Sequence, residues 1–377
     1  MPAPTKLSED KGEFFRDINA ARYPSYPLQP AVNAILKTNE DFACNEVDIF
    51  TCASAMGNLL RFVRGVDKEF RIIVEVIGST AFFLRRENSP IETIPNVRGY
   101  GHTFPEASTT WEHGVKGSET HQRMVQYTFS GLTCVVRVEV DGYLSNLPLR
   151  RDQHVAGGDT GVDEQLISAL QGSAVTPHKP QGAKRGLSIQ SGGQEVPQSA
   201  LFDLKTRSFR RKDTDILDEE LPRLWVRQIP TFILGFHEYG VFNDVRVQYV
   251  REDVERWEKA NEDSLRRFAS LLHTLIDFAI GHPDGRFEVV HEEGKSAIDL
   301  RDLDQDVGHV LPEELKDRWV TGSTAAAKSI NSDRKLSAEA SDSSEKKTDL
   351  LISWESSSEE DFTACSSTCG YCGHCGK

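Results

Sequence analysis

The sequence predicts a single α/β domain, a mixed sheet flanked by helices, that is interrupted by a long polar insertion. Alternating apolar residues mark strand pairs such as "EFRIIVEVIG" and "STAFFLRRE", which are joined by a turn at Gly78-Ser79. Apolar residues recur at helical spacing from Val254 to Ala279. Residues 146–198 are rich in glycine, proline, glutamine and serine and short of aromatics, which predicts a disordered insertion within the domain.

The remaining elements follow in chain order. Apolar spacing predicts a short helix over about 52–64, and "VQYTFSGLTCVVRVEVDGYL" predicts two strands joined at Ser130-Gly131. After the insertion come a strand, "ALFDLKTRS", and a helical pattern with an internal proline, "TDILDEELPRLWVRQ". Two further strands, "TFILGFHEYGVF" and "DVRVQYV", precede the long helix, which Gly281-His-Pro ends.

Composition divides the chain into four segments. Residues 1–40 are polar and punctuated by proline, which predicts a flexible arm, and 41–290 hold the α/β domain. Residues 291–350 predict a charged, serine-rich linker, and 351–377 a cysteine-rich tail.

The chain has 377 residues, of which 38% are hydrophobic and 27% charged, with a formal net charge of −14 at pH 7. No apolar run is long enough for a membrane helix and the N-terminus lacks a signal-peptide core, so we expect a nuclear or cytoplasmic protein without a membrane partner. The seven cysteines then favour free thiols or metal ligands. The aspartate-rich D-D-x-x-D motif of isoprenyl diphosphate synthases is absent.

Two strands carry acids two residues apart. Asp203 and Lys205 share one face of their strand, and Glu139 and Asp141 share one face of theirs, because strand side chains alternate. If the strands are neighbours, three carboxylates and an amine converge, and such carboxylates repel one another unless a cation neutralises them. Oxygen ligands select Mg²⁺ or Mn²⁺, which activates water for phosphoryl hydrolysis. The simpler alternative is a set of ion pairs on a solvated sheet face.

The order of motifs resembles the PD-(D/E)XK nuclease fold and, within it, a divergent, fungal-type member of the decapping exoribonuclease and RNA 5′-pyrophosphohydrolase family. The resemblance spans roughly residues 45–280, apart from the insertion. The stretches that carry it are "MGNLLRFVRG", "FRIIVEVIGSTAFFLRRE", "GHTFPE", "VEVDG", "DLKTRS" and "LWVRQIPTFILGFHE".

The resemblance implies a metal-dependent hydrolase or nuclease that acts on RNA 5′ ends. It implies Mg²⁺ or Mn²⁺ as cofactor, with the metal ligands Glu106, Glu139, Asp141 and Asp203. The implied catalytic residues are Lys205, Glu139 and Gln228. Two departures are that Asp203 stands where the family has glutamate and that Pro105 precedes Glu106.

These departures leave open a catalytically weakened protein that serves as an RNA-binding or protein-interaction module. Cap removal, pyrophosphate removal and exonuclease digestion are left open as well, since all three use the same metal core. RNA contacts are expected from Arg85, Arg86 and Arg207.

The C-terminal tail carries closely spaced cysteines, which are Cys365, Cys369, Cys372 and Cys375. Four thiolates suit tetrahedral Zn²⁺, and neighbouring glycines allow the tight turns that such spacing requires. The spacing is shorter than in a zinc finger, so a redox-active cluster and a tail without function remain alternatives.

Overall fold

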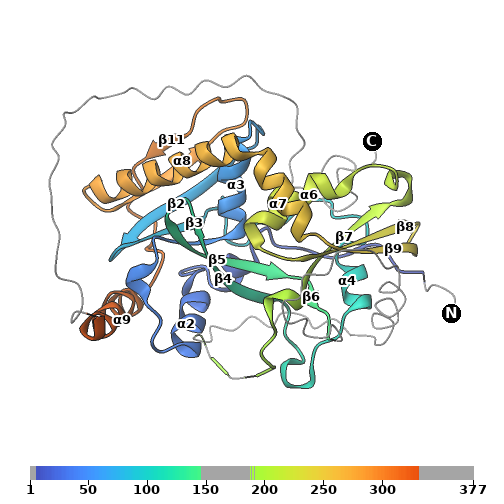
Figure 1. The fold of residues 1–377 in the computed structure, drawn as a ribbon, viewed down its shortest axis with the longest axis horizontal. Coiled ribbons are helices and arrows are strands. Elements are labelled where there is room, and N and C mark those ends of the chain that lie inside the picture. The colour runs from blue at the N-terminus through green and yellow to red at the C-terminus, as the bar shows by residue number, and fades with distance from the viewer. Residues whose placement is uncertain (1–5, 146–186, 188, 191, 331–377) are drawn as a thin grey trace.

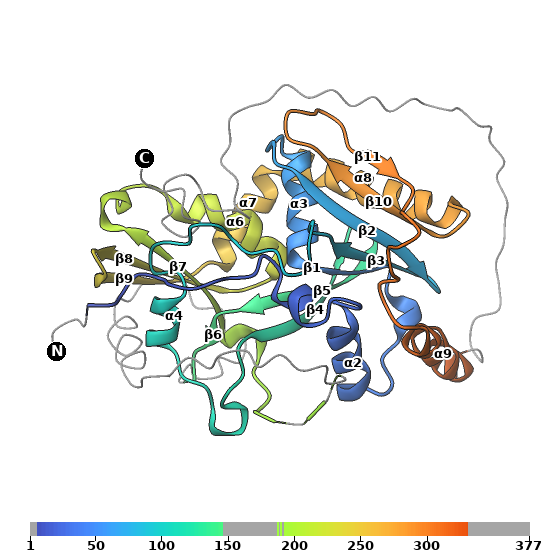
Figure 2. The same cartoon turned by 180° about the vertical axis from the view of Figure 1, so that it is seen from behind.

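The computed structural model describes residues 6–145, 187, 189–190 and 192–330, and its strands form two sheets (Figures 1 and 2). The larger sheet has seven strands in the order β11-β10-β2-β3-β1-β5-β4, and the smaller has four in the order β6-β7-β8-β9. The strands are β1 (Ile49–Cys52), β2 (Phe70–Ile77), β3 (Thr80–Arg85), β4 (His121–Phe129), β5 (Leu132–Val140), β6 (Gly142–Tyr143), β7 (Leu201–Ser208), β8 (Thr231–Glu238), β9 (Val241–Tyr249), β10 (Arg286–His291) and β11 (Asp299–Arg301).

The strand pairing is mixed in both sheets. β1 is parallel to β3 and to β5 in the larger sheet, and β7 is parallel to β8 in the smaller one. The other strand pairs are antiparallel. The predicted mixed α/β fold is therefore confirmed.

Helices cover both faces of the larger sheet (Figure 1). The helices are α1 (Ile18–Arg22), α2 (Gln29–Thr38), α3 (Ala53–Val63), α4 (Thr103–Ser108), α6 (Ile216–Arg227), α7 (Arg251–Ala260), α8 (Glu262–Gly281) and α9 (Glu313–Ile330). Helices α3, α6 and α8 pack on one face, whereas α2 and α9 pack on the other. The long predicted helix is divided at Asn261, which ends α7 and begins α8.

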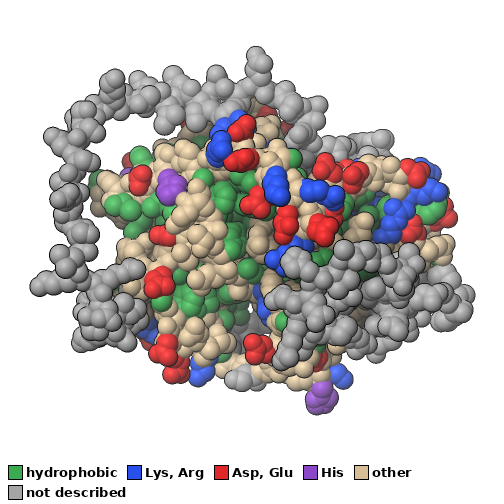
Figure 3. Space-filling model, in the orientation of Figure 1, with side chains coloured by type: hydrophobic (Ala, Val, Ile, Leu, Met, Phe, Trp, Pro, Cys, Tyr) green, Lys and Arg blue, Asp and Glu red, His purple; other side chains and the backbone are tan. Residues whose placement is uncertain are grey.

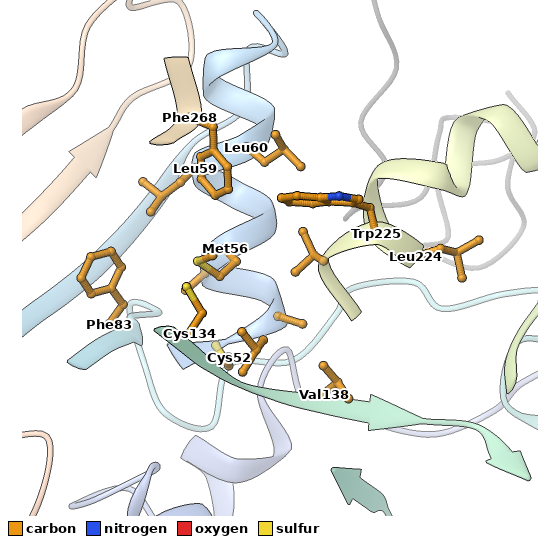
Figure 4. Packing of buried hydrophobic residues seen from close by; sticks show 14 of the residues in the cluster. Cys52, Met56, Leu59, Leu60, Phe83, Cys134, Val138, Leu224, Trp225 and Phe268 are labelled. Atoms are coloured by element: carbon orange, nitrogen blue, oxygen red, sulfur yellow. The ribbon is translucent and has the colours of Figure 1, made fainter. Parts of the chain in front are cut away.

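Side-chain alternation along the strands explains the two-sided packing. In β3, Phe82 lies in the cluster with α2 and α9, and the next residue, Phe83, lies in the cluster with α3 and α8. Figure 4 shows Met56, Leu59 and Leu60 of α3 in the second of these clusters, with Trp225 of α6 beside them. Trp225 is 4% exposed, so it fixes α6 against the sheet.

Two segments outside the predicted domain belong to the folded core, which corrects the expected arm and linker. Residues 1–40 were expected to be flexible, yet α2 buries Val32 at 0% exposure. One of the prolines of this segment, Pro30, stands in the first turn of α2, where a missing N–H is harmless. Within the expected linker 291–350, α9 buries Trp319 at 1% exposure.

The predicted insertion 146–198 and the cysteine tail lie wholly or largely outside the described residues. The end of the insertion is described, and there Val196 is buried in the core. None of the helices in the described part of the chain is long and apolar enough to cross a membrane.

Candidate functional site

The chain passes from the larger sheet to the smaller one at Asp141, between the end of β5 at Val140 and the start of β6 at Gly142. β6 pairs with β7, where Gly142 lies opposite Phe202. A Cβ atom at position 142 would stand 2.5 Å from Cζ of Phe202, so this approach requires glycine. Oδ2 of Asp141 accepts a hydrogen bond from the backbone N–H of Leu204 at 2.6 Å. The E-x-D and D-x-K segments are therefore adjacent.

Asp203 is fully buried, and both of its carboxylate oxygens are bound by arginines of α6. Oδ1 accepts a hydrogen bond from Nη2 of Arg223, and Oδ2 accepts one from Nη1 of Arg227 at 2.8 Å. The two arginines are four residues apart and thus share one face of the helix. Because Trp225 anchors α6 in the core, this face is held toward β7.

Glu220 extends the network along the same face of α6. It is 3% exposed and accepts hydrogen bonds from Nε of Arg223 at 2.8 Å and from Nη2 of Arg207 at 3.1 Å. Burial alone would raise the pKa of Glu220, but Arg223, Lys205 and Arg207 outweigh it and lower the pKa to about 2. Burial would lower the pKa of Arg223, yet Asp203 and Glu220 raise it. Arg223 is therefore a permanent cation held between Asp203 and Glu220.

The two acids of the E-x-D segment, Glu139 and Asp141, have raised pKa values. Burial and the negative charge of Asp203 raise the pKa of Asp141 to about 7. Burial also raises the pKa of Glu139, although Arg227 and Arg137 oppose this. Glu139 is exposed and Asp141 is partly exposed, but protein surrounds both densely enough to displace much of their hydration. Near neutral pH the cluster carries less negative charge than its carboxylates suggest.

Lys205 lies at the same site and is half-buried on β7. Its charge lowers the pKa of Glu220 and also that of His102, for which burial is the larger cause. His102 precedes α4, and its ring stacks on Phe14 of the N-terminal segment with the ring centroids 3.7 Å apart. The structure thus brings together Glu139, Asp141, Asp203 and Lys205.

Gln228 and Glu106 are placed differently. Gln228 follows α6 in a left-handed conformation (φ 53°), and its Nε2 donates a hydrogen bond to the carbonyl oxygen of Trp225 at 2.5 Å. Its amide therefore satisfies the end of its own helix. Glu106 lies in α4 with its side chain exposed. The catalytic role expected of Gln228 and the metal-binding role expected of Glu106 stay predictions.

The three arginines expected to contact RNA are paired with acids of the protein. Arg85 pairs with Glu87, and Arg86 pairs with Glu288 at 3.0 Å. Arg207, which was expected to face RNA, is instead 5% exposed, because it neutralises the buried Glu220. Acidic and basic side chains lie next to one another in the upper and right-hand parts of the face seen in Figure 3.

The predicted metal-ligand set does not fit a divalent ion as the side chains stand. Within the described ranges, no group of three or more histidine, cysteine, aspartate or glutamate side chains is arranged to hold a metal. Both oxygens of Asp203 accept from guanidinium groups, and one oxygen of Asp141 accepts from a backbone amide. The cysteines proposed as zinc ligands lie outside the described residues.

Three side chains that complete the site are not among the predicted site residues: Glu220, Arg223 and Arg227. Their signal in the sequence is a helical one, because spacings of three and four residues place all three on one face. That spacing predicts a shared face but not which strand the face meets.

Residues 1–319 match the family described as a domain of unknown function, DUF8563. No curated protein sequence matches the chain.

Solved structures resemble the fold. Scheffersomyces stipitis Rai1 in complex with (3′-NADP)+ and calcium ion has a TM-score of 0.51 at 14% identity, covering 80% of this chain and 80% of that one. Candida albicans Rai1 in complex with pU5-Mn²⁺ has a TM-score of 0.47 at 11% identity, covering 82% of this chain and 86% of that one. K. lactis Dxo1 in complex with manganese has a TM-score of 0.45 at 11% identity, with coverages of 78% and 77%.

The expected resemblance to decapping exoribonucleases is thus confirmed at the level of the fold, at low sequence identity. The chain has a Rai1-like fold and belongs to the DUF8563 family.

Proposed function

We propose that this protein binds the 5′ ends of RNA at the junction of β5, β6 and β7 and hydrolyses them weakly or not at all. The observation that carries this proposal is the binding of both Asp203 oxygens by Arg223 and Arg227. Each Asp203 oxygen already accepts from a guanidinium group, and these two cations neutralise the carboxylate and repel a metal ion that approaches it. The order of motifs along the chain and the Rai1-like fold support an RNA 5′ end as the ligand.

A nucleotide ligand is consistent with the fold, since Scheffersomyces stipitis Rai1 binds (3′-NADP)+. The charges at the junction also suit phosphate. Asp203 and Glu220 are balanced by arginines, whereas a pKa of about 7 leaves Asp141 less than fully ionised at neutral pH. Lys205 then adds a positive charge beside this balanced network.

Arg227 is the arginine best placed to contact a phosphate. Its side chain is 21% exposed, against 10% for Arg223. Its hydrogen bonds to Asp203 and to the carbonyl oxygen of Glu139 are both made by Nη1. Guanidinium groups donate N–H hydrogen bonds to phosphate. Nη2 of Arg227 can therefore donate to a phosphate while Nη1 keeps its hydrogen bonds to Asp203 and Glu139.

Binding is tested by fluorescence anisotropy with RNA oligonucleotides of one sequence that carry a 5′-triphosphate, a 5′-monophosphate or a 5′-hydroxyl group. In EDTA, we expect the phosphorylated RNAs to bind more tightly than the hydroxyl RNA. Arg227→Gln should weaken binding of the phosphorylated RNAs at least about tenfold, since a charge-assisted hydrogen bond contributes roughly 1.5–3 kcal/mol.

Arg246→Gln is the matched control, because Arg246 is an exposed strand arginine paired with Asp244. It should change the affinity less than twofold. Equal affinity for all three 5′ ends, or equal losses in the two variants, would show that the junction does not bind the RNA 5′ phosphate.

Metal-dependent hydrolysis of RNA 5′ ends is the second candidate function. It is favoured by the position of Asp141, which binds the backbone amide of the residue after Asp203, and of Glu139 two residues before Asp141. This function requires Arg223 and Arg227 to release Asp203 before a divalent ion binds. The nuclear or cytoplasmic location and zinc binding by the tail remain predictions.

A further inference from the structure

Asp203 requires a positive charge beside it, because burying an ionised carboxylate away from water costs free energy unless the charge is paired. Its exposed fraction is 0%, so bulk solvent does not supply this charge. The two guanidinium groups of α6 do so, and together they carry the same charge as one divalent ion. A metal ion brings its charge from solution, whereas these cations are part of the chain.

The structure holds these two cations firmly in place. Arg223 binds Asp203 on one side and Glu220 on the other, and its side chain is 10% exposed. Arg227 is held by Asp203 and by the backbone of Glu139. The helix that carries both arginines is fixed by buried Trp225. Displacing them would leave Glu220 with only part of its partners, which is unfavourable at a buried position.

We infer that Arg223 and Arg227 are a resident cation pair that takes the place of a divalent metal at Asp203, and that neutralising both arginines opens a Mn²⁺ site on Asp203 and Asp141. Asp141 is adjacent, because its carboxylate binds the amide of the residue that follows Asp203. Without the arginines, these acids and Glu139 would repel one another, and a hard divalent cation relieves such repulsion.

The inference rests on the proposed function in that it concerns the same site, but metal binding without RNA tests it separately. The experiment is a Mn²⁺ titration of the full chain, followed by calorimetry and by the electron paramagnetic resonance signal of free Mn²⁺. The proteins are the wild type, Arg223→Met/Arg227→Met, and the same double variant with Asp203→Asn. Methionine removes the charge while keeping an unbranched side chain.

We expect the double variant to gain one Mn²⁺ site at least tenfold tighter than any binding by the wild type. The gain should disappear when Asp203→Asn is added. Arg223→Lys/Arg227→Lys is the control that keeps both charges, and it should gain no site. Metal bound by the cysteine tail or by surface acids is common to all variants and cancels in the comparison.

Two outcomes would overturn the inference. One is a folded double variant, judged by its thermal melting, that gains no Mn²⁺ site. The other is a Mn²⁺ site in the wild type that weakens at least tenfold in Asp141→Asn, and this test remains decisive even if the double variant does not fold. The proposed function fails instead if the wild-type protein does not bind phosphorylated RNA in EDTA. The Mn²⁺ titration contains no RNA, so failure of the inference and failure of the proposed function are distinguishable.

Discussion

Replacing Asp203 by asparagine is expected to lower the free energy of unfolding by about 3–5 kcal/mol, the usual cost of removing one partner from a buried ion pair. Asp203 is fully buried and neutralises Arg223 and Arg227. Asparagine removes the charge and also turns an NH₂ group, a donor, toward guanidinium donors. Urea unfolding followed by circular dichroism measures the loss.

The matched control is Asp244→Asn on strand β9. Asp244 also pairs with an arginine, Arg246, at 2.8 Å, but its side chain is 29% exposed and that of Arg246 is 43% exposed. An exposed pair contributes about 0–1 kcal/mol, so this variant should lose at most that amount. Similar losses for the two variants would mean that Asp203 is not a buried counter-ion.

Replacing Trp319 by alanine is expected to cost about 3–5 kcal/mol, because it removes a large buried side chain. The indole of Trp319 packs against Phe50 and Phe82, with ring centroids 5.6 and 5.4 Å away. Its Nε1 donates a hydrogen bond to Oγ1 of Thr80 at 2.9 Å. This side chain fixes α9 to the face of the sheet opposite α3. Urea unfolding again measures the loss.

Arg318→Ala is the control, because Arg318 is exposed on the same helix. It should change the free energy of unfolding by less than about 0.5 kcal/mol. Trp319→Phe separates packing from the hydrogen bond, since it keeps an aromatic ring and leaves Thr80 without its donor. If Trp319→Ala is no more destabilising than Arg318→Ala, α9 is not part of the folded core.

The strands of the hairpins β2–β3, β4–β5 and β8–β9, and strand β7, were predictable because their signal is local. Alternation of apolar residues in β2 and β3 follows from the two-residue repeat of a strand, and any sequence window contains it. The sequence left the adjacency of the E-x-D and D-x-K segments open, because it depends on β6, where Gly142 permits close contact with β7.

The partners of Asp203 were not predictable in the same way. Arg223 and Arg227 share a helix face by their spacing, but their contact with Asp203 depends on how α6 docks, which Trp225 decides from the opposite side. The burial of α2 and α9 likewise depends on distant strands. Trp319, for example, packs against residues more than 200 positions earlier in the chain.

The central claim is that the site binds RNA 5′ ends while arginines, and no metal ion, neutralise Asp203. The most direct test incubates RNA labelled at its 5′ triphosphate with excess protein in Mn²⁺, and measures release of the label in a single turnover. We predict intact RNA, with a rate no higher than that of Asp141→Asn. Rapid release in Mn²⁺ that EDTA stops and Asp141→Asn abolishes would contradict the claim and establish the metal-dependent hydrolase instead.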